Sequence, residues 1–238
     1  MRVLLINPNT SVEMTERIAD EARRHVDGAV EIVAVTATYG CAVIASRAAY
    51  VVAAHAALDL YADHGAGADA VVLACFGDPG LEALREVTTV PVIGLLDSAL
   101  AVAASAGRAF AIVTAGPAWV PMLEERVRLT PHAGALRGVF AIAANGLAVS
   151  RDPARATAAL QGAVEAAQAA GAQAVVLGGS ALAGFGARLA SAAELIDPLA
   201  VAMQAAATAT AATTSAAATA AAPNDAVRYR ARAPSRRR

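Results

Sequence analysis

Short β-branched runs alternate with alanine-rich stretches along almost the whole chain, and this alternation constrains the fold more than any other feature. The runs are continuously apolar, which is typical of strands buried in a parallel sheet between covering helices. The pattern predicts an α/β protein with doubly wound parallel sheet structure. The predicted strands are 2–6, 30–36, 69–75, 91–95, 108–114, 137–141 and 173–178, and the predicted helices are 11–25, 43–64, 79–86, 98–106, 117–128, 153–170 and 198–203.

One predicted strand has a near copy later in the chain. Residues 69–75 read Asp-Ala-Val-Val-Leu-Ala-Cys and residues 173–179 read Gln-Ala-Val-Val-Leu-Gly-Gly, and Gly-Ala precedes both runs. The repeat predicts two similar halves, 1–106 and 107–204, related by a pseudo-twofold axis, with the active site between them. We expect the C-terminal helix to be able to pack back on the first half. Residues 205–238 are expected to be a low-complexity alanine and threonine tail with an arginine-rich end.

The composition excludes several classes of function. The chain has no lysine, so neither Schiff-base chemistry nor a phosphate-loop lysine fits it. Two cysteines cannot form a four-cysteine zinc site and the four histidines lack metal-ligand spacing, so we expect no metal site. Alanine supplies about half of the 57% apolar residues, so we expect a cytoplasmic protein with no membrane segment. No nucleic-acid partner is expected from the arginine-rich end.

The repeat brings the ends of two equivalent strands, Cys75 and Gly179, to one place. Ligands of open α/β sheets bind beyond the carboxyl ends of the strands, so we expect these residues to face each other across a small-molecule substrate. A thiol suits acid–base chemistry, because a helix N-terminus can lower its reference pKa of about 8.5 towards neutrality. Cys75 precedes a helix start predicted at residues 78–79, and the backbone N–H groups of Phe76 and Gly77 could hold a developing enolate oxygen. The alternative is a buried cysteine that serves only as a small apolar residue.

Further candidates for substrate binding lie at the other strand-to-helix turns. Asn9 and Thr10 follow the first strand, where an amide side chain and backbone amides can hold a carboxylate or an imide. Thr114 and Gly116 occupy the matching turn of the second half. Ser180 is expected to donate a hydrogen bond to substrate, since an unassisted serine is a poor base at neutral pH.

Three stretches carry a resemblance to a known family. Residues 6–11 read Ile-Asn-Pro-Asn-Thr-Ser, residues 74–81 read Ala-Cys-Phe-Gly-Asp-Pro-Gly-Leu, and residues 195–200 read Leu-Ile-Asp-Pro-Leu-Ala. They resemble the aspartate/glutamate/hydantoin racemase superfamily, and most closely its hydantoin and allantoin racemase branch. The resemblance implies a cofactor-free enzyme in which Cys75 and a second cysteine exchange protons on opposite faces of the substrate. It also implies a homo-oligomer.

The chain departs from that family at the second cysteine, where Gly179 stands. Cys41 does not substitute easily, because it lies in the loop after the second strand, where the resemblance implies substrate-facing residues rather than a base. The leading expectation is a cofactor-independent racemase acting at an acidic carbon next to a carbonyl of a hydantoin, an allantoin or an amino acid. Racemisation could proceed with water on the face of Gly179. The alternatives are a single-cysteine decarboxylase or lyase, a ring-opening enzyme with Cys75 as nucleophile, and a ligand-binding protein without activity.

Overall fold

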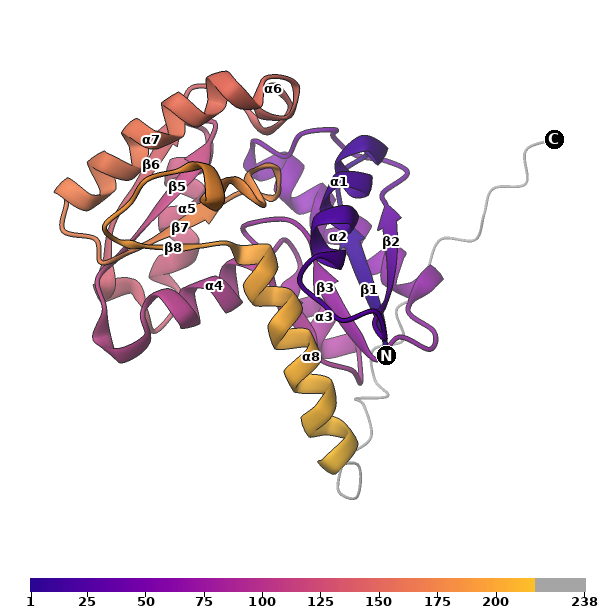
Figure 1. Ribbon diagram of the computed structural model, residues 1–238. Helices are drawn as coiled ribbons and strands as arrows, with labels where there is room; N and C mark the ends of the chain where they lie inside the picture. The colour runs from indigo at the N-terminus through magenta and orange to yellow at the C-terminus, as the bar shows by residue number, and fades with distance from the viewer. Residues whose placement is uncertain (217–238) are drawn as a thin grey trace.

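The computed structural model describes residues 1–216 and folds them into two α/β lobes (Figure 1). The arginine-rich end predicted at residues 223–238 lies outside the described residues. The four strands of the first lobe are β1 (Arg2–Asn7), β2 (Glu31–Thr36), β3 (Ala70–Leu73) and β4 (Val92–Gly94). Those of the second lobe are β5 (Phe110–Ala115), β6 (Leu136–Ile142), β7 (Ala174–Gly178) and β8 (Glu194–Ile196).

Both sheets are parallel and share one strand order, β2-β1-β3-β4 in the first lobe and β6-β5-β7-β8 in the second. Leu4 of β1 lies opposite Val71 of β3, and Ile112 of β5 lies opposite Val176 of β7. The predicted α/β class with two similar parallel-sheet halves is therefore confirmed. Sequence reasoning missed β8, because its three residues begin with a charged glutamate and form no continuous apolar run.

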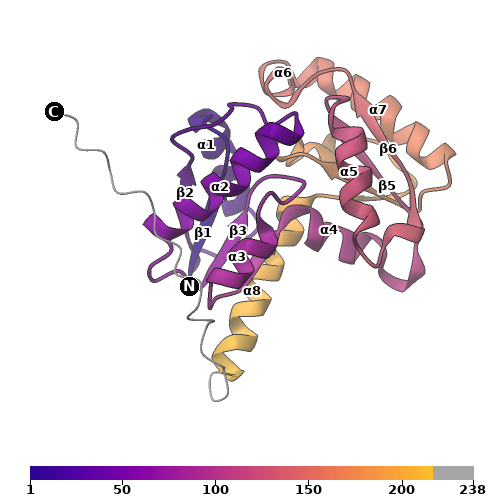
Figure 2. The ribbon, with the colours of Figure 1, turned by 180° about the vertical axis from the view of Figure 1, so that it is seen from behind.

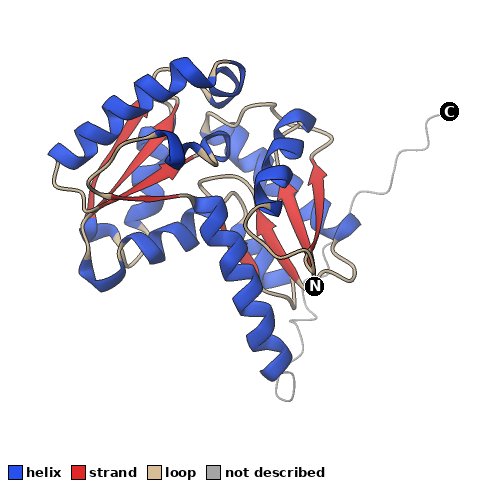
Figure 3. Ribbon diagram, in the orientation of Figure 1, coloured by secondary structure: helices blue, strands red, loops and turns tan. Residues whose placement is uncertain are grey.

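Helices cover both faces of each sheet (Figures 2 and 3). In β1, Val3 and Leu5 join a buried cluster that includes α1 and α8, whereas Leu4 and Ile6 face α2 and α3. The helices are α1 (Val12–Arg23), α2 (Arg47–His64), α3 (Leu81–Val87), α4 (Leu95–Ala103), α5 (Trp119–Arg128), α6 (Gly146–Arg151), α7 (Pro153–Ala169) and α8 (Pro198–Ala216). Short 3-10 turns are η1 (Ser105–Gly107), η2 (Ala133–Ala135), η3 (Ser180–Leu182) and η4 (Phe185–Arg188).

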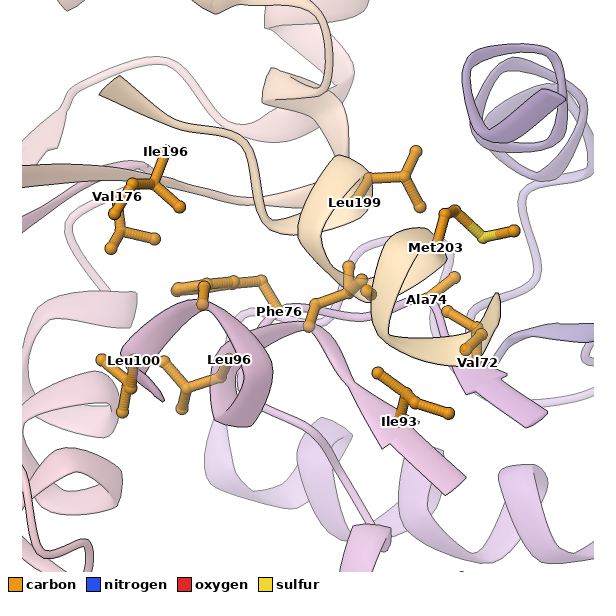
Figure 4. Packing of buried hydrophobic residues seen from close by; sticks show 14 of the residues in the cluster. Val72, Ala74, Phe76, Ile93, Leu96, Leu100, Val176, Ile196, Leu199 and Met203 are labelled. Carbon is orange, nitrogen blue, oxygen red and sulfur yellow. The ribbon is translucent and has the colours of Figure 1, made fainter. Parts of the chain in front are cut away.

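Each lobe sends its last helix onto the sheet of the other lobe. α4 follows β4 of the first sheet and packs on β7 and β8, while α8 follows β8 and packs on β3 and β4. Leu96 of α4 and Met203 of α8 consequently share one buried cluster with Phe76, Val72 and Val176 (Figure 4). This exchange gives the two lobes a common core, which fixes the strand ends of one lobe against those of the other.

α8 is longer than the helix that the sequence predicts at residues 198–203. It continues to Ala216, through the first part of the expected low-complexity tail, and Ala206 is fully buried in the common core. Alanine has the highest helix propensity, but a nearly uniform alanine run shows no apolar periodicity from which a buried face could be read. Within residues 1–216, no helix has both the length and the apolar character needed to cross a membrane.

Candidate active site

A cavity of about 100 Å³ lies where the carboxyl ends of the strands of both lobes meet. The turn after β3 brings Cys75 to it and the turn after β7 brings Gly179, so the two copies of the repeat share one cavity. Of the residues that the sequence proposes for the site, those that line the cavity are Asn9, Cys75, Phe76, Thr114, Gly116, Gly179 and Ser180.

Two proposed residues, Thr10 and Gly77, do not line the cavity and instead hold its wall. The backbone amide of Thr10 donates to the carbonyl of Cys41 at 3.2 Å, which ties the first turn to the loop at residues 42–45 on the cavity wall. Gly77 has a φ of +112°, and its carbonyl accepts the hydroxyl of Tyr50 at 2.7 Å. These two residues support the loops that form the cavity wall, and their role in substrate binding stays a prediction.

The thiol of Cys75 is buried, and its residue is only 7% exposed. Burial, followed by the nearby carboxylate of Asp78, raises the pKa of Cys75 far above that of a free cysteine. The sequence suggested the opposite direction, because it placed a helix N-terminus directly after the thiol. In the structure α3 begins only at Leu81, with Gly80 as its N-cap. The resting group is therefore a thiol, and its Sγ lies 4.0 Å from the carbonyl oxygen of Phe76.

Asp78 caps a helix, but not the one that follows it in sequence. Its carboxylate accepts the backbone amides of Leu96 at 3.1 Å and Asp97 at 2.8 Å, at the start of α4. Asp78 itself has a φ of +55°, a conformation that residues other than glycine adopt rarely. Burial raises its pKa to about 7, although the two backbone amides favour the charged form. The turn after Cys75 is thus anchored on α4, which packs on the opposite sheet.

The opposite side of the cavity offers space but no acid or base. Gly179 has a φ of +152°, and a Cβ built on it would lie 3.6 Å from Leu182 Cγ, an ordinary contact distance. The hydroxyl of Ser180 donates to the backbone carbonyl of Ala74 at 2.8 Å, across the two lobes. This hydrogen bond joins the two lobes, and donation from Ser180 to a substrate stays a prediction.

Sequence reasoning missed several residues of the cavity wall. Asn145 is the N-cap of α6, and its side-chain oxygen accepts the amide of Ala148 at 3.0 Å. An Asn-Gly pair is a recognisable turn signal, but a six-residue helix was too short for us to predict. Trp119 also reaches the wall, and the remaining apolar lining includes Val43, Ile44 and Leu147.

The electrostatic character of the cavity is uniform. Among the described residues that line it, none carries a formal charge, and the thiol of Cys75 is the sole group that titrates. The polar side chains on the wall are amides and hydroxyls. This donor set can hold a neutral ligand through hydrogen bonds and move one proton at one sulfur atom.

The structure thus has two similar parallel α/β lobes, and the cavity between them is uncharged and holds a single thiol. Comparison with known proteins shows the class of protein to which this arrangement belongs. The family model for Asp/Glu/Hydantoin racemase matches residues 3–206. The chain is 35% identical over 214 residues to a hydantoin racemase of Paenarthrobacter aurescens. This alignment covers 87% of this chain and 89% of that relative. The chain therefore belongs to the Asp/Glu/hydantoin racemase family.

Solved structures agree with this assignment. An allantoin racemase from Klebsiella pneumoniae superposes with a TM-score of 0.81 at 30% identity, covering 89% of this chain and 88% of that one. An allantoin racemase from Pseudomonas fluorescens also gives a TM-score of 0.81, at 29% identity and over 87% and 90% of the two chains. With these relatives, the chain is an isomerase of the racemase class.

Proposed function

We propose that this chain racemises a 5-substituted hydantoin without a cofactor, with Cys75 as the acid and base at the ring carbon between nitrogen and carbonyl. The observation that carries the proposal is the thiol of Cys75, the one titrating group among the described residues of the cavity wall. The hydantoin racemase of Paenarthrobacter aurescens, which shares 35% of its aligned residues with this chain, supports the substrate class.

The uncharged wall favours a neutral ring over a free amino acid. An amino acid carries a carboxylate and an ammonium group. Burying a neutral polar group without a hydrogen-bond partner costs roughly 2–7 kcal/mol, and burying an unpaired charge costs far more. A hydantoin instead presents two carbonyl oxygens and two N–H groups. The side-chain oxygen of Asn9 is occupied by the amide of Ser11 at 2.9 Å, and that of Asn145 by Ala148. Both asparagines thus keep their NH₂ groups as donors for ring carbonyls.

The rest of the wall suits an apolar ring substituent. Ile44, Leu147 and Trp119 contribute hydrocarbon and indole surface to the same cavity. A benzyl or isobutyl group can bury against such surface, whereas the ureido group of allantoin would lose hydrogen bonds to water there. We therefore place hydantoins with apolar substituents ahead of allantoin.

The proton balance is as follows for the enantiomer whose C–H bond faces Cys75. Hydroxide from the solvent first removes the proton of the Cys75 thiol, which gives the thiolate and water. The thiolate takes the ring proton, and the C–H electron pair moves onto the adjacent carbonyl oxygen as an enolate, which the amide donors stabilise. A water molecule on the side of Gly179 then delivers a proton to the opposite face and leaves as hydroxide, which replaces the hydroxide used in the first step. The other enantiomer runs the same path backwards: hydroxide on the side of Gly179 accepts the ring proton, the thiol of Cys75 donates one to the opposite face, and water then returns a proton to the thiolate.

Deuterium exchange tests this proposal. The protein would be incubated with each enantiomer of 5-benzylhydantoin in D₂O, and the ring carbon followed by NMR and chiral chromatography. Enantiomer formation with matching deuterium uptake above the protein-free rate is expected. Cys75→Ser should reduce both by about 10²–10⁴-fold, the usual loss on removing a general acid or base, while Cys41→Ser retains them. Full activity in Cys75→Ser contradicts the proposal, as does CO₂ release from an arylmalonate without any hydantoin exchange.

A further inference from the structure

A second group of converging side chains lies outside the catalytic cavity, where the end of α1 meets the start of α8. Glu21 and His25 are four residues apart on and just after α1, and Asp197 is the residue before α8. One carboxylate oxygen of each acid and one ring nitrogen of His25 all lie within 4.8 Å of one another. Two neighbouring residues of the first lobe and one residue more than 170 positions away therefore place three ligand atoms at one centre.

One ring nitrogen of His25 is an unsatisfied polar atom at this centre. Its Nε2 is shielded from solvent and makes no hydrogen bond within the described residues. The nearest carboxylate oxygen, Glu21 Oε1, is 3.4 Å away. A buried imidazole nitrogen without a hydrogen bond costs about 1–3 kcal/mol, so a group that accepts its lone pair would stabilise the fold.

Both carboxylates are held in place by other contacts that leave lone pairs available. Glu21 Oε2 accepts Nη1 of Arg24 at 2.7 Å, which leaves Oε1 towards His25. The carboxylate of Asp197 accepts the backbone amides of Gly184 at 2.7 Å and Leu199 at 2.9 Å. Each carboxylate oxygen has a further lone pair, and hydrogen bonds of this kind orient the ligands of metal sites.

We propose that Glu21, His25 and Asp197 bind a divalent transition-metal ion such as Zn²⁺. One imidazole nitrogen and two carboxylate oxygens are donors that Zn²⁺ accepts, and its bonds of about 2.0–2.2 Å require only small side-chain shifts from the present spacing. The three residues line a cavity of about 620 Å³, which has room for the ion and coordinating water. The site is separate from the proposed racemase chemistry.

The ion would fasten parts of both lobes together. Glu21 and His25 belong to the first lobe, whereas Asp197 follows β8 of the second and holds Gly184 in the loop after β7. Ser180, at the start of that loop, lines both this cavity and the catalytic one. Metal binding would therefore stabilise the junction of the lobes and restrict the loop that carries Gly179.

Metal titration of the full chain tests the proposal. After treatment with EDTA and removal of the chelator, Zn²⁺ would be added in a calorimeter, and thermal unfolding recorded with and without the ion. We expect saturable one-to-one binding and a higher unfolding midpoint with Zn²⁺. Glu21→Gln and His25→Gln should each weaken binding at least tenfold and remove the rise in the midpoint, while circular dichroism confirms that both variants fold.

Two control variants separate this site from other metal-binding groups. His64→Gln, which replaces an exposed histidine at the end of α2, should bind Zn²⁺ as the unaltered chain does. Cys41→Ser should also bind it normally, although Cys41 is an exposed thiol. The proposal is overturned if no saturable binding is found, or if His25→Gln binds Zn²⁺ as tightly as the unaltered chain does.

Discussion

The carboxylate of Asp78 accepts the backbone amide of Asp97 at 2.8 Å, which ties the turn after Cys75 to the first turn of α4. Because α4 packs on the sheet of the second lobe, this one contact connects the thiol to the opposite side of the cavity. Asp78 is nearly fully buried, at 1% exposed. A buried carboxylate at this position makes the stability of the protein depend on pH.

Replacing Asp78 with asparagine should reduce that dependence. The pKa of Asp78 is raised to about 7, whereas an aspartate in an unfolded chain titrates near 3.9. Between these values the folded protein binds a proton that the unfolded chain has lost. The contribution of Asp78 to stability is thus fully present below about pH 4 and is lost as the pH rises through about 7.

Urea unfolding at pH 5 and pH 8 measures this effect. From pH 5 to pH 8 the unaltered chain should lose more free energy of unfolding than Asp78→Asn, by about 1–3 kcal/mol, since each pKa unit corresponds to about 1.4 kcal/mol. All other titrating groups are common to the two proteins and cancel in the comparison. Equal losses in both proteins would show that the carboxyl of Asp78 titrates normally.

Tyr50 supports the same turn from the other side. Its hydroxyl donates to the carbonyl of Gly77 at 2.7 Å, and burial raises its pKa, so it remains a donor at high pH. Tyr50→Phe should cost about 1 kcal/mol of stability and lower kcat several-fold with little change in KM, because the turn that places Cys75 becomes less fixed. Tyr61→Phe on the same helix is the matched control. A kcat that drops equally in both variants would remove the positioning role.

The sequence predicts the fold well because the strands are long apolar runs, and β3 and β7 are near copies. It does not reveal that α4 packs on the sheet of the second lobe, because this helix is short and apolar on most sides. It also assigns Asp78 to the wrong helix. An aspartate before a proline is a common helix start, and only the folded chain shows that Leu96 and Asp97 donate to its carboxylate.

For the candidate site, sequence reasoning finds the residues at strand ends and misses those brought in by loops. Cys75 and Gly179 follow from the repeat, since parallel strands direct their carboxyl ends to one edge. Asn145 and Leu147 come from a short helix without a periodic pattern. The pKa of Cys75 could not be predicted either, because its direction depends on how deeply the thiol is buried.

Gly178 and Gly162 should respond in opposite directions to replacement by alanine. A Cβ at Gly178 would lie 2.4 Å from Cε1 of Phe76 and 2.8 Å from Cγ2 of Ile112, so Gly178→Ala should destabilise the protein by about 1–3 kcal/mol. Gly162 is exposed within α7 and has no atom within 4 Å of its would-be Cβ. Gly162→Ala should stabilise by up to about 1 kcal/mol, as alanine does in helix interiors. Urea unfolding of both variants tests these signs, and a stable Gly178→Ala would mean that Phe76 does not pack there.

Gly179 tests whether two faces of the substrate are in use. A Cβ there would make only ordinary contact with Leu182, so a side chain fits, but the φ of +152° strains any residue other than glycine by about 1–3 kcal/mol. Gly179→Cys and Gly179→Ala should share this loss of stability, whereas only the cysteine adds a second thiol opposite Cys75. We expect faster racemisation and deuterium exchange of 5-benzylhydantoin in Gly179→Cys than in Gly179→Ala, measured at equal folded concentration. If the two variants exchange at the same rate, the face of Gly179 is not where the proton passes.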